Sequence, residues 1–170
     1  TSADSLGLDV DADSTVTSLS VAHITPVSIA NTKTLSGAIT VTAGSIKLAE
    51  TGTLDSSISM SGGTLAAEKS LTVSGTLTQS GNITIDVLTD KTLTYSGTAI
   101  SLGANTLTLS GGGTFSNTNA LVLNDANSLL SLAGILTIGD VEGTAASSTG
   151  KGIKVTSSAT LGDYDLSAES

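Results

Sequence analysis

Three aspartates at alternate positions near the start of the chain have the spacing closest to a known metal-ligand pattern. Asp9, Asp11 and Asp13, followed by Ser14, match the opening of a calcium-binding loop, in which Ca²⁺ is held by several carboxylate and carbonyl oxygens. The match then ends, because the sixth position is Ser14 rather than Gly and the twelfth is Ser20 rather than Glu. We expect the three carboxylates to form the solvent side of a strand, and we keep calcium bound between subunits as the alternative hypothesis.

Three further pairs of carboxylates have a spacing that could support acid–base chemistry. Glycoside hydrolysis needs two carboxyl groups facing each other across a cleft, whereas pairs of this kind beside glycines are typical of solvated corners. The chain also has no Arg to clamp a sugar acid and no Trp to stack on a sugar. We therefore expect no catalytic residues and no enzymatic activity. The pairs are Asp86 with Asp90, Asp140 with Glu142, and Asp163 with Asp165.

Transition-metal and nucleic-acid binding are both disfavoured by the composition. His23 is the only histidine and there is no cysteine, so such a metal would lack its usual ligands. The formal charge is −9, and the six cationic residues are all Lys. Binding of nucleic acid needs cations that replace the counterions of the phosphates. We expect neither a cofactor nor a nucleic-acid partner.

The apolar residues that must form the core are aliphatic rather than aromatic. Among 170 residues there are one Phe, two Tyr, no Trp and one Pro, with 19 Gly and many Ser and Thr. The mean hydropathy is +0.31, which argues against disorder. An antiparallel sandwich of this length would normally centre its core on several large rings.

Apolar residues alternate with polar ones over most of the chain, as in Leu71 and Val73 or Ile83, Ile85 and Val87. Alternation at period two indicates strands with one buried face. Ser-Gly pairs follow many of these strands, and Gly suits the tight corners between them. These pairs begin at Ser36, Ser61, Ser74, Ser80, Ser96 and Ser110.

A short phrase recurs along the chain, as KSLTVSG at 69–75, KTLTYSG at 91–97 and NTLTLSG at 105–111. Such intervals favour stacked coils of about 20 residues. We predict an all-β fold, a parallel β-helix (β-solenoid) of short coils with Ser-Gly corners, and we keep an antiparallel β-sandwich as the alternative.

The chain divides into two parts on this interpretation. Residues 1–35, which hold the single His and the single Pro, are expected to form an irregular first coil or a linker or assembly segment, and residues 36–170 the solenoid repeats. The most apolar run, 128–139, is too short to cross a bilayer as a helix, so no membrane span is expected.

Three stretches, 36–54, 71–85 and 106–117, resemble the passenger regions of bacterial surface proteins, namely autotransporters and filamentous-haemagglutinin-like adhesins. They share the order of strand, Ser-Gly corner and strand. The resemblance implies a right-handed parallel β-helix exported to the bacterial cell surface, and it carries over no functional residue.

The leading functional hypothesis is a structural or adhesive extracellular protein. It would be a self-assembling filament or sheath subunit, or a stalk segment of a larger adhesin. Its expected partners are further copies joined through terminal strands, or more of a longer chain, and a glycan or protein receptor on a cell surface.

Two alternative functions remain. One is a carbohydrate-binding or carbohydrate-cleaving β-helix protein. The other is an ice-binding protein, because flat ranks of Thr-x-Thr triplets can order water; the uneven intervals of these triplets indicate that most are ordinary outward strand residues. The triplets begin at Thr15, Thr40, Thr51, Thr76, Thr92 and Thr106.

Overall fold

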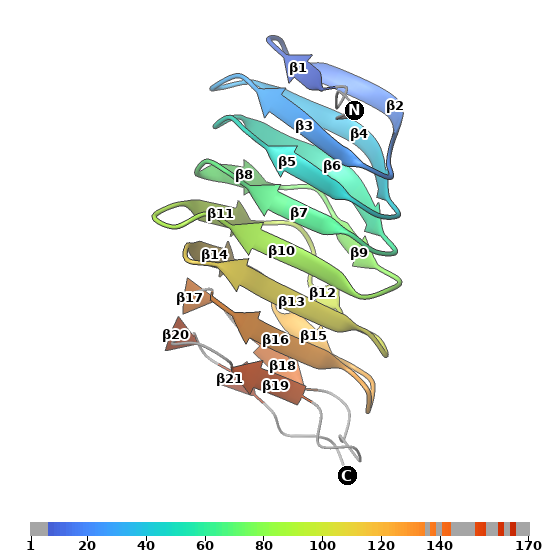
Figure 1. Cartoon of the computed structure of the whole chain (residues 1–170), viewed down its shortest axis with the longest axis vertical. Helices are drawn as coiled ribbons and strands as arrows, with labels where there is room; N and C mark the ends of the chain where they lie inside the picture. Colours follow the sequence, from blue (N-terminus) through green and yellow to red (C-terminus); the bar gives the residue numbers. More distant parts are fainter. Residues whose placement is uncertain are drawn as a thin grey trace, which may run out of the picture.

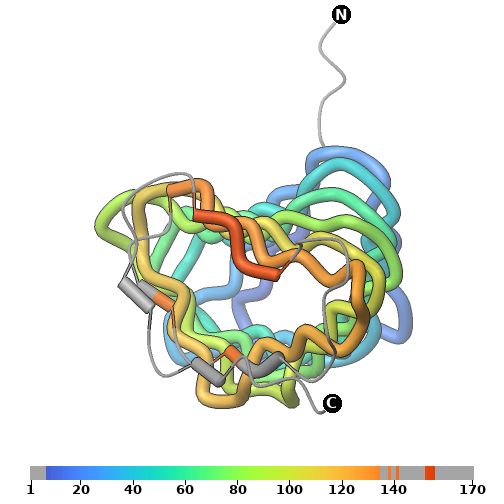
Figure 2. The backbone as a smooth tube through the Cα atoms, turned by 90° about the horizontal axis from the view of Figure 1, so that it is seen from below, coloured from blue at the N-terminus to red at the C-terminus, as the bar shows by residue number. Residues whose placement is uncertain are grey.

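The computed structural model describes residues 7–134, 137–138, 141–143, 152–155, 160–161 and 164–165. Within them every regular element is a β-strand, and every ladder between strands is parallel. The chain winds around a central axis, and its coils stack from the N-terminal to the C-terminal end (Figures 1 and 2). The predicted β-solenoid is confirmed, and the alternative antiparallel sandwich is wrong.

Sheet A is the first of three sheets and contains one strand from each coil. Its eight strands follow one another in order along the axis. They are β1 (Leu8–Val10), β3 (Ile24–Ile29), β5 (Ser45–Leu48), β7 (Thr64–Ala67), β10 (Ile83–Val87), β13 (Thr106–Gly111), β16 (Leu129–Ala133) and β19 (Gly152–Val155).

Sheet B contains nine strands and lies behind sheet A in Figure 1. Its first three strands are eight residues long and are followed by shorter ones. They are β2 (Ser14–Val21), β4 (Thr34–Val41), β6 (Thr53–Met60), β8 (Leu71–Val73), β11 (Thr92–Tyr95), β14 (Thr114–Asn117), β17 (Thr137–Ile138) and β20 (Thr160–Leu161), with β9 (Leu77–Gln79) paired to β6 beside β8.

Sheet C begins only after the long strands of sheet B have ended. Its four strands are β12 (Ile100–Ser101), β15 (Leu121–Leu123), β18 (Val141–Gly143) and β21 (Tyr164–Asp165). Coils that include a third sheet need more residues. Side chains hydrogen-bonded between neighbouring coils are 19 residues apart for Ser74 and Asp55, and 24 apart for Ser110 and Asp86. The solenoid therefore changes from two sheets to three partway along its axis.

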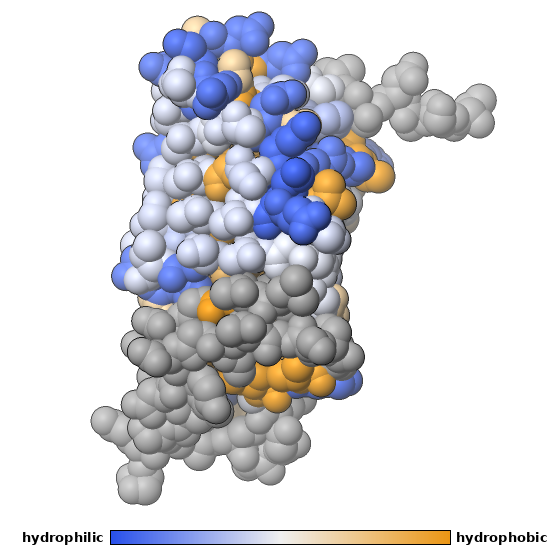
Figure 3. Space-filling view, turned by 90° about the vertical axis from the view of Figure 1, so that its left-hand side faces the viewer, coloured by the Kyte–Doolittle hydropathy of each residue, from blue (hydrophilic) through white to orange (hydrophobic). Residues whose placement is uncertain are grey.

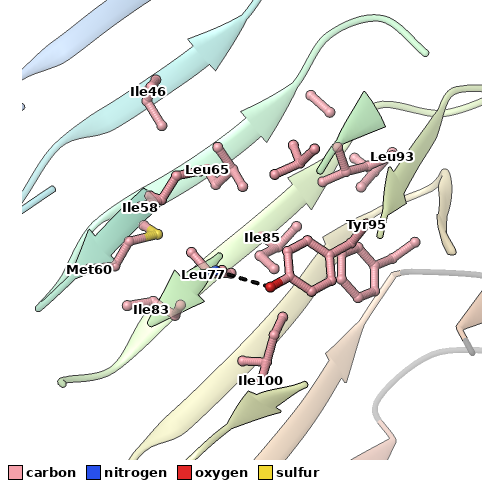
Figure 4. Packing of buried hydrophobic residues seen from close by; sticks show 14 of the residues in the cluster. Ile46, Ile58, Met60, Leu65, Leu77, Ile83, Ile85, Leu93, Tyr95 and Ile100 are labelled. Atoms are coloured by element: carbon pink, nitrogen blue, oxygen red, sulfur yellow. Dashed lines mark hydrogen bonds between the residues drawn. The ribbon is translucent and has the colours of Figure 1, made fainter. Parts of the chain in front are cut away.

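The core is a set of aliphatic columns that continue from coil to coil. Because side chains alternate across a strand, most apolar residues of the strands point inward and stack on those of the next coil (Figure 4), with Ile24 and Val155 as exposed exceptions. Burial of each such side chain stabilises the fold by about 2 kcal/mol. One fully buried column consists of Ile46, Leu65, Ile85, Leu109 and Leu132.

A column of very small residues marks the line where sheet B bends. Gly37 pairs with Ser56 in the next strand, and Gly75 and Gly97 continue the column. A Cβ atom added at Gly75 would lie 2.0 Å from Ser56 O, and one at Gly97 would lie 2.1 Å from Gly75 O. Coil stacking thus excludes a larger side chain. Gly37 lies inside β4 rather than at a corner, so the expected corner at Ser36 is wrong, because a strand can bend here without ending.

The strand that spans this line in β6 is divided in the next coil. β8 and β9 both pair with β6, but only β8 is continued in sheet B by β11. Two side chains supply hydrogen bonds at the interrupted ladder: Tyr95 Oη accepts one from Leu77 N (3.0 Å), and Gln79 Nε2 donates one to Leu102 O (3.0 Å). Sheet C starts at this point.

The described part of segment 1–35, for which an irregular first coil or a linker or assembly segment was expected, contributes β1, β2 and β3 to sheets A and B. The ladder between β2 and β4 contains a register shift between Val16 and Leu19. No helix among the described residues has the length and apolar content needed to cross a membrane.

Candidate functional site

Of the three aspartates of the calcium hypothesis, Asp9 lies within β1, and Asp11 and Asp13 lie in the corner between β1 and β2. Asp13 Oδ1 accepts a hydrogen bond from Thr34 N at 2.9 Å, so this carboxylate joins the first corner to the next coil. In the part of the chain that the structure describes, no three His, Cys, Asp or Glu side chains gather closely enough to hold a metal ion. Asp9, Asp11 and Asp13 therefore form no ligand cluster within one chain, and calcium between subunits stays a hypothesis.

Of the three carboxylate pairs considered for acid–base chemistry, only Asp86 with Asp90 has both members among the described residues. Asp86 lies in β10, and its Oδ1 accepts a hydrogen bond from Ser110 Oγ (2.5 Å). Asp90 lies in the corner after β10 with a φ of 62°. Asp140 and Asp163 fall outside the described residues. Glu142 and Asp165 are described by their backbone, and they are register partners in β18 and β21. His23 is exposed in the corner between β2 and β3.

Sheet B presents adjacent columns of hydroxyl groups on its outer side. The first column contains Thr34, Thr53, Thr72, Thr94 and Ser116, each in register with the next. A second column lies two residues away along the strands: Ser70 Oγ accepts a hydrogen bond from Thr92 N (3.0 Å), and Thr92 pairs with Thr114. The apolar residues between the two columns, such as Leu71, Leu93 and Phe115, are buried, whereas the Thr and Ser side chains are half-buried or exposed.

A third column follows on the other side of the first. Ser74 Oγ donates a hydrogen bond to Asp55 Oδ1 (2.9 Å), and backbone hydrogen bonds continue the ladder through Ser96 and Thr118. The columns repeat every 4.8 Å or so along the axis and about 6.6 Å along the strands. We call these three columns the hydroxyl face; its only charged member among the described residues is Asp55.

A furrow runs beside the third column, where sheet B gives way to sheet C. It is a shallow hollow that is open to solvent, with a volume of about 470 Å³. Figure 3 faces the side of the rod at the left of Figure 1, where β8, β11 and β14 of sheet B lie, and pale and blue residues cover most of its described surface. The furrow is lined by Asp55, Ser57, Ser74, Gly75, Thr76, Ser96, Gly97, Thr98 and Asn119.

Polar groups in the furrow are held by hydrogen bonds to their own scaffold. Asn119 Nδ2 donates to Gly97 O at 2.6 Å, and Tyr95, buried beneath Gly97, is hydrogen-bonded to the Thr98 side chain. Burial raises the pKa of the Tyr95 phenol, although its hydrogen bonds with Leu77 and Thr98 act in the opposite direction. The phenol therefore stays neutral and fixes the floor of the furrow.

Sequence reasoning did not find the furrow, although a signal for it exists. The triplet Ser-Gly-Thr occurs at 74–76 and again at 96–98, and both copies line the furrow. Tyr95 gives no such signal, because nothing in the sequence indicates that a strand divides next to it.

The Thr-x-Thr triplets are distributed over several parts of the solenoid. Those beginning at Thr51 and Thr92 contribute Thr53, Thr92 and Thr94 to the hydroxyl face. The triplet beginning at Thr106 lies in sheet A. The Thr-x-Thr triplets thus recur at uneven intervals in the sequence although part of the hydroxyl face is in register. The reason is that Ser takes the place of Thr at some positions of each column.

Comparison of the chain with protein-family models, with curated proteins and with solved structures gives no match.

Proposed function

We propose that this chain is a structural rod of an extracellular bacterial surface protein, either a stalk segment of a larger adhesin or the subunit of a filament or sheath. The observation that carries the proposal is the continuity of its columns. From β3 to β16, each strand of sheet A stacks in parallel register on the next. A body built this way extends by adding coils, without a new core for each addition.

The mechanical basis of such a rod lies in the direction of its hydrogen bonds. Ladder hydrogen bonds run between coils, along the axis, and aliphatic columns pack beneath them. Local opening of one coil would expose buried columns on both sides, so segments in the middle should resist opening and proteolysis. This resistance suits a protein that works outside the cell.

Charge and surface suit a rod that stays dispersed in solution. The net charge of −9 opposes aggregation, and the exposed large apolar residues are isolated rather than clustered in the described part. Adhesion would then depend on polar surfaces, of which the hydroxyl face and its furrow are the most regular.

Sedimentation velocity tests the proposal and separates its two versions. A stalk segment should sediment as one elongated monomer whose frictional ratio does not depend on protein concentration. A filament subunit should form larger species as the concentration rises, and Ca²⁺ would promote them if Asp9, Asp11 and Asp13 bind it between copies. A monomer with the frictional ratio of a sphere would contradict both versions.

Ice binding is the second candidate, favoured by one observation: three hydroxyl columns lie side by side in register on sheet B. Thermal hysteresis of the purified chain tests it. Replacement of Thr94 by Tyr in the centre of this face should abolish the hysteresis, whereas Thr84→Tyr on sheet A, also half-buried within a ladder, should leave it unchanged. Absence of hysteresis in the unmodified chain would exclude this function.

A further inference from the structure

We infer that the furrow beside the hydroxyl face binds a linear, uncharged oligosaccharide that lies along the rod axis. The inference rests on the proposed function, since it names the class of ligand that an adhesive rod would hold. The lining comes from residues in or directly after β6, β8, β11 and β14, which are successive neighbours in sheet B.

The shape of the furrow favours an elongated ligand. Asp55 lies at one end and Asn119 at the other, three inter-strand spacings apart, which is roughly 14 Å. Between them Ser74 and Ser96 repeat the same side chain at the spacing of the coils. A ligand that repeats along its own length can make the same contact at each coil, whereas a compact ligand would contact one part of the furrow only.

The chemistry of the lining favours sugar hydroxyls. Ser and Thr hydroxyls both donate and accept hydrogen bonds, as sugar hydroxyls do. Asp55 Oδ1 accepts from Ser74 Oγ, and no hydrogen bond to Asp55 Oδ2 occurs in the described part of the chain, so this oxygen can accept a charge-assisted bond from a ligand. Asn119 keeps its amide oriented through its bond to Gly97 O.

Charge restricts the class of sugar further. No Lys lines the furrow, and the chain carries a net charge of −9. Acidic polysaccharides would be repelled. No aromatic ring lines the furrow either, so the affinity for each sugar unit is low and binding strength must come from several units held together. A neutral oligosaccharide of several units meets both conditions.

The furrow is also rigid before any ligand arrives. Gly75 and Gly97 form a floor without side chains, and a Cβ atom at Gly97 would lie 2.7 Å from Tyr95 Oη. Tyr95 is fixed by its bond from Leu77 N. A site whose groups are already oriented loses less conformational entropy when it binds.

The test is a titration of the ¹⁵N-labelled chain with cellohexaose and, separately, chitohexaose, followed by amide chemical shifts. We expect saturable shifts at furrow residues such as Gly75, Ser96 and Gly97 with at least one of the two probes. Asp55→Ala should weaken this binding about tenfold or more, through loss of a charge-assisted hydrogen bond. Ser57→Tyr, at an exposed position, should fill the furrow and weaken binding as much.

Two matched variants serve as controls. Asp86 accepts a hydrogen bond from a serine of the next coil as Asp55 does, but on sheet A, so Asp86→Ala should leave the affinity unchanged. Ser59 is exposed on the same strand as Ser57 and lies outside the furrow, so Ser59→Tyr should have no effect either.

The inference is overturned if neither probe gives saturable shifts in the furrow, or if the two controls weaken binding as much as Asp55→Ala and Ser57→Tyr. Either result would leave the proposed rod intact, provided that the chain still sediments as an elongated particle. A compact particle would instead remove the proposed function, whatever the titration shows.

Discussion

The hydroxyl of Tyr95 accepts a hydrogen bond from the backbone N–H of Leu77 at 3.0 Å (Figure 4). Leu77 begins β9, the short strand that pairs with β6 but is not continued in sheet B. In a continued ladder, the N–H of Leu77 would donate to a backbone carbonyl of the next strand of sheet B, but that strand is missing beside β9. A side chain from the next coil thus replaces a backbone acceptor where two sheets become three.

Removal of this hydroxyl should destabilise the chain. In Tyr95→Phe the buried N–H of Leu77 loses its acceptor, and an unsatisfied buried donor costs about 1–3 kcal/mol. The ring itself stays packed against Phe115, whose centroid lies 6.3 Å away. Urea denaturation of the two proteins measures the difference in free energy of unfolding. Equal stabilities would show that another group or water serves Leu77.

Replacement of Gln79, the second side chain at the interrupted ladder, is expected not to lower the free energy of unfolding. Its Oε1 is buried without a hydrogen-bond partner among the described residues, whereas Leu102 O, the acceptor of Gln79 Nε2, also receives Asn105 N and Asn105 Nδ2. Gln79→Met should therefore keep or raise the free energy of unfolding, by up to about 1 kcal/mol. A clear loss in the same urea assay would mean that Oε1 has a partner in solution.

Alkaline pH should weaken the fold through Tyr95. Burial raises the pKa of its phenol above the ordinary 10.0, so the native chain keeps a proton that the unfolded chain loses. The stabilisation from the neutral phenol is complete below pH 10 and is lost as the pH rises through the native pKa. Measured from pH 8 to 11, the free energy of unfolding should fall more steeply for the unmodified chain than for Tyr95→Phe. Parallel curves would argue against a raised pKa.

The glycine column along the bend of sheet B is expected to tolerate no side chain. In Gly75→Ala the new Cβ would lie 2.0 Å from Ser56 O, and displacement of the two coils should cost about 1–3 kcal/mol. Gly7→Ala is the matched control, because the nearest atom to its Cβ would be Pro26 O at an ordinary 3.4 Å. Thermal melting compares them; a loss of stability at both positions would point to a general effect of replacing Gly by Ala rather than to the clash.

Alternation of apolar residues predicted most of the strands, and the recurring phrase predicted that they stack as a solenoid. Ile83, Ile85 and Val87 form one inward-facing set as expected, because one buried face imposes period two wherever strands lie on a core. Sequence patterns near Gly37 were misleading, since a Ser-Gly pair suits both a corner and a bend inside a strand. The third sheet and the furrow were not predicted, because they depend on which coil interrupts its ladder, and this is decided by contacts such as Tyr95 with Leu77.

Negative-stain electron microscopy of the purified chain, with and without Ca²⁺, is the most direct test of the proposed rod. We expect narrow particles of one uniform width, longer than they are wide, because every described coil stacks on its neighbours along a single axis. Separate short rods would identify a stalk segment, and long fibres of the same width a self-assembling subunit. Round or irregular particles under both conditions would contradict the proposal that this chain is a structural rod.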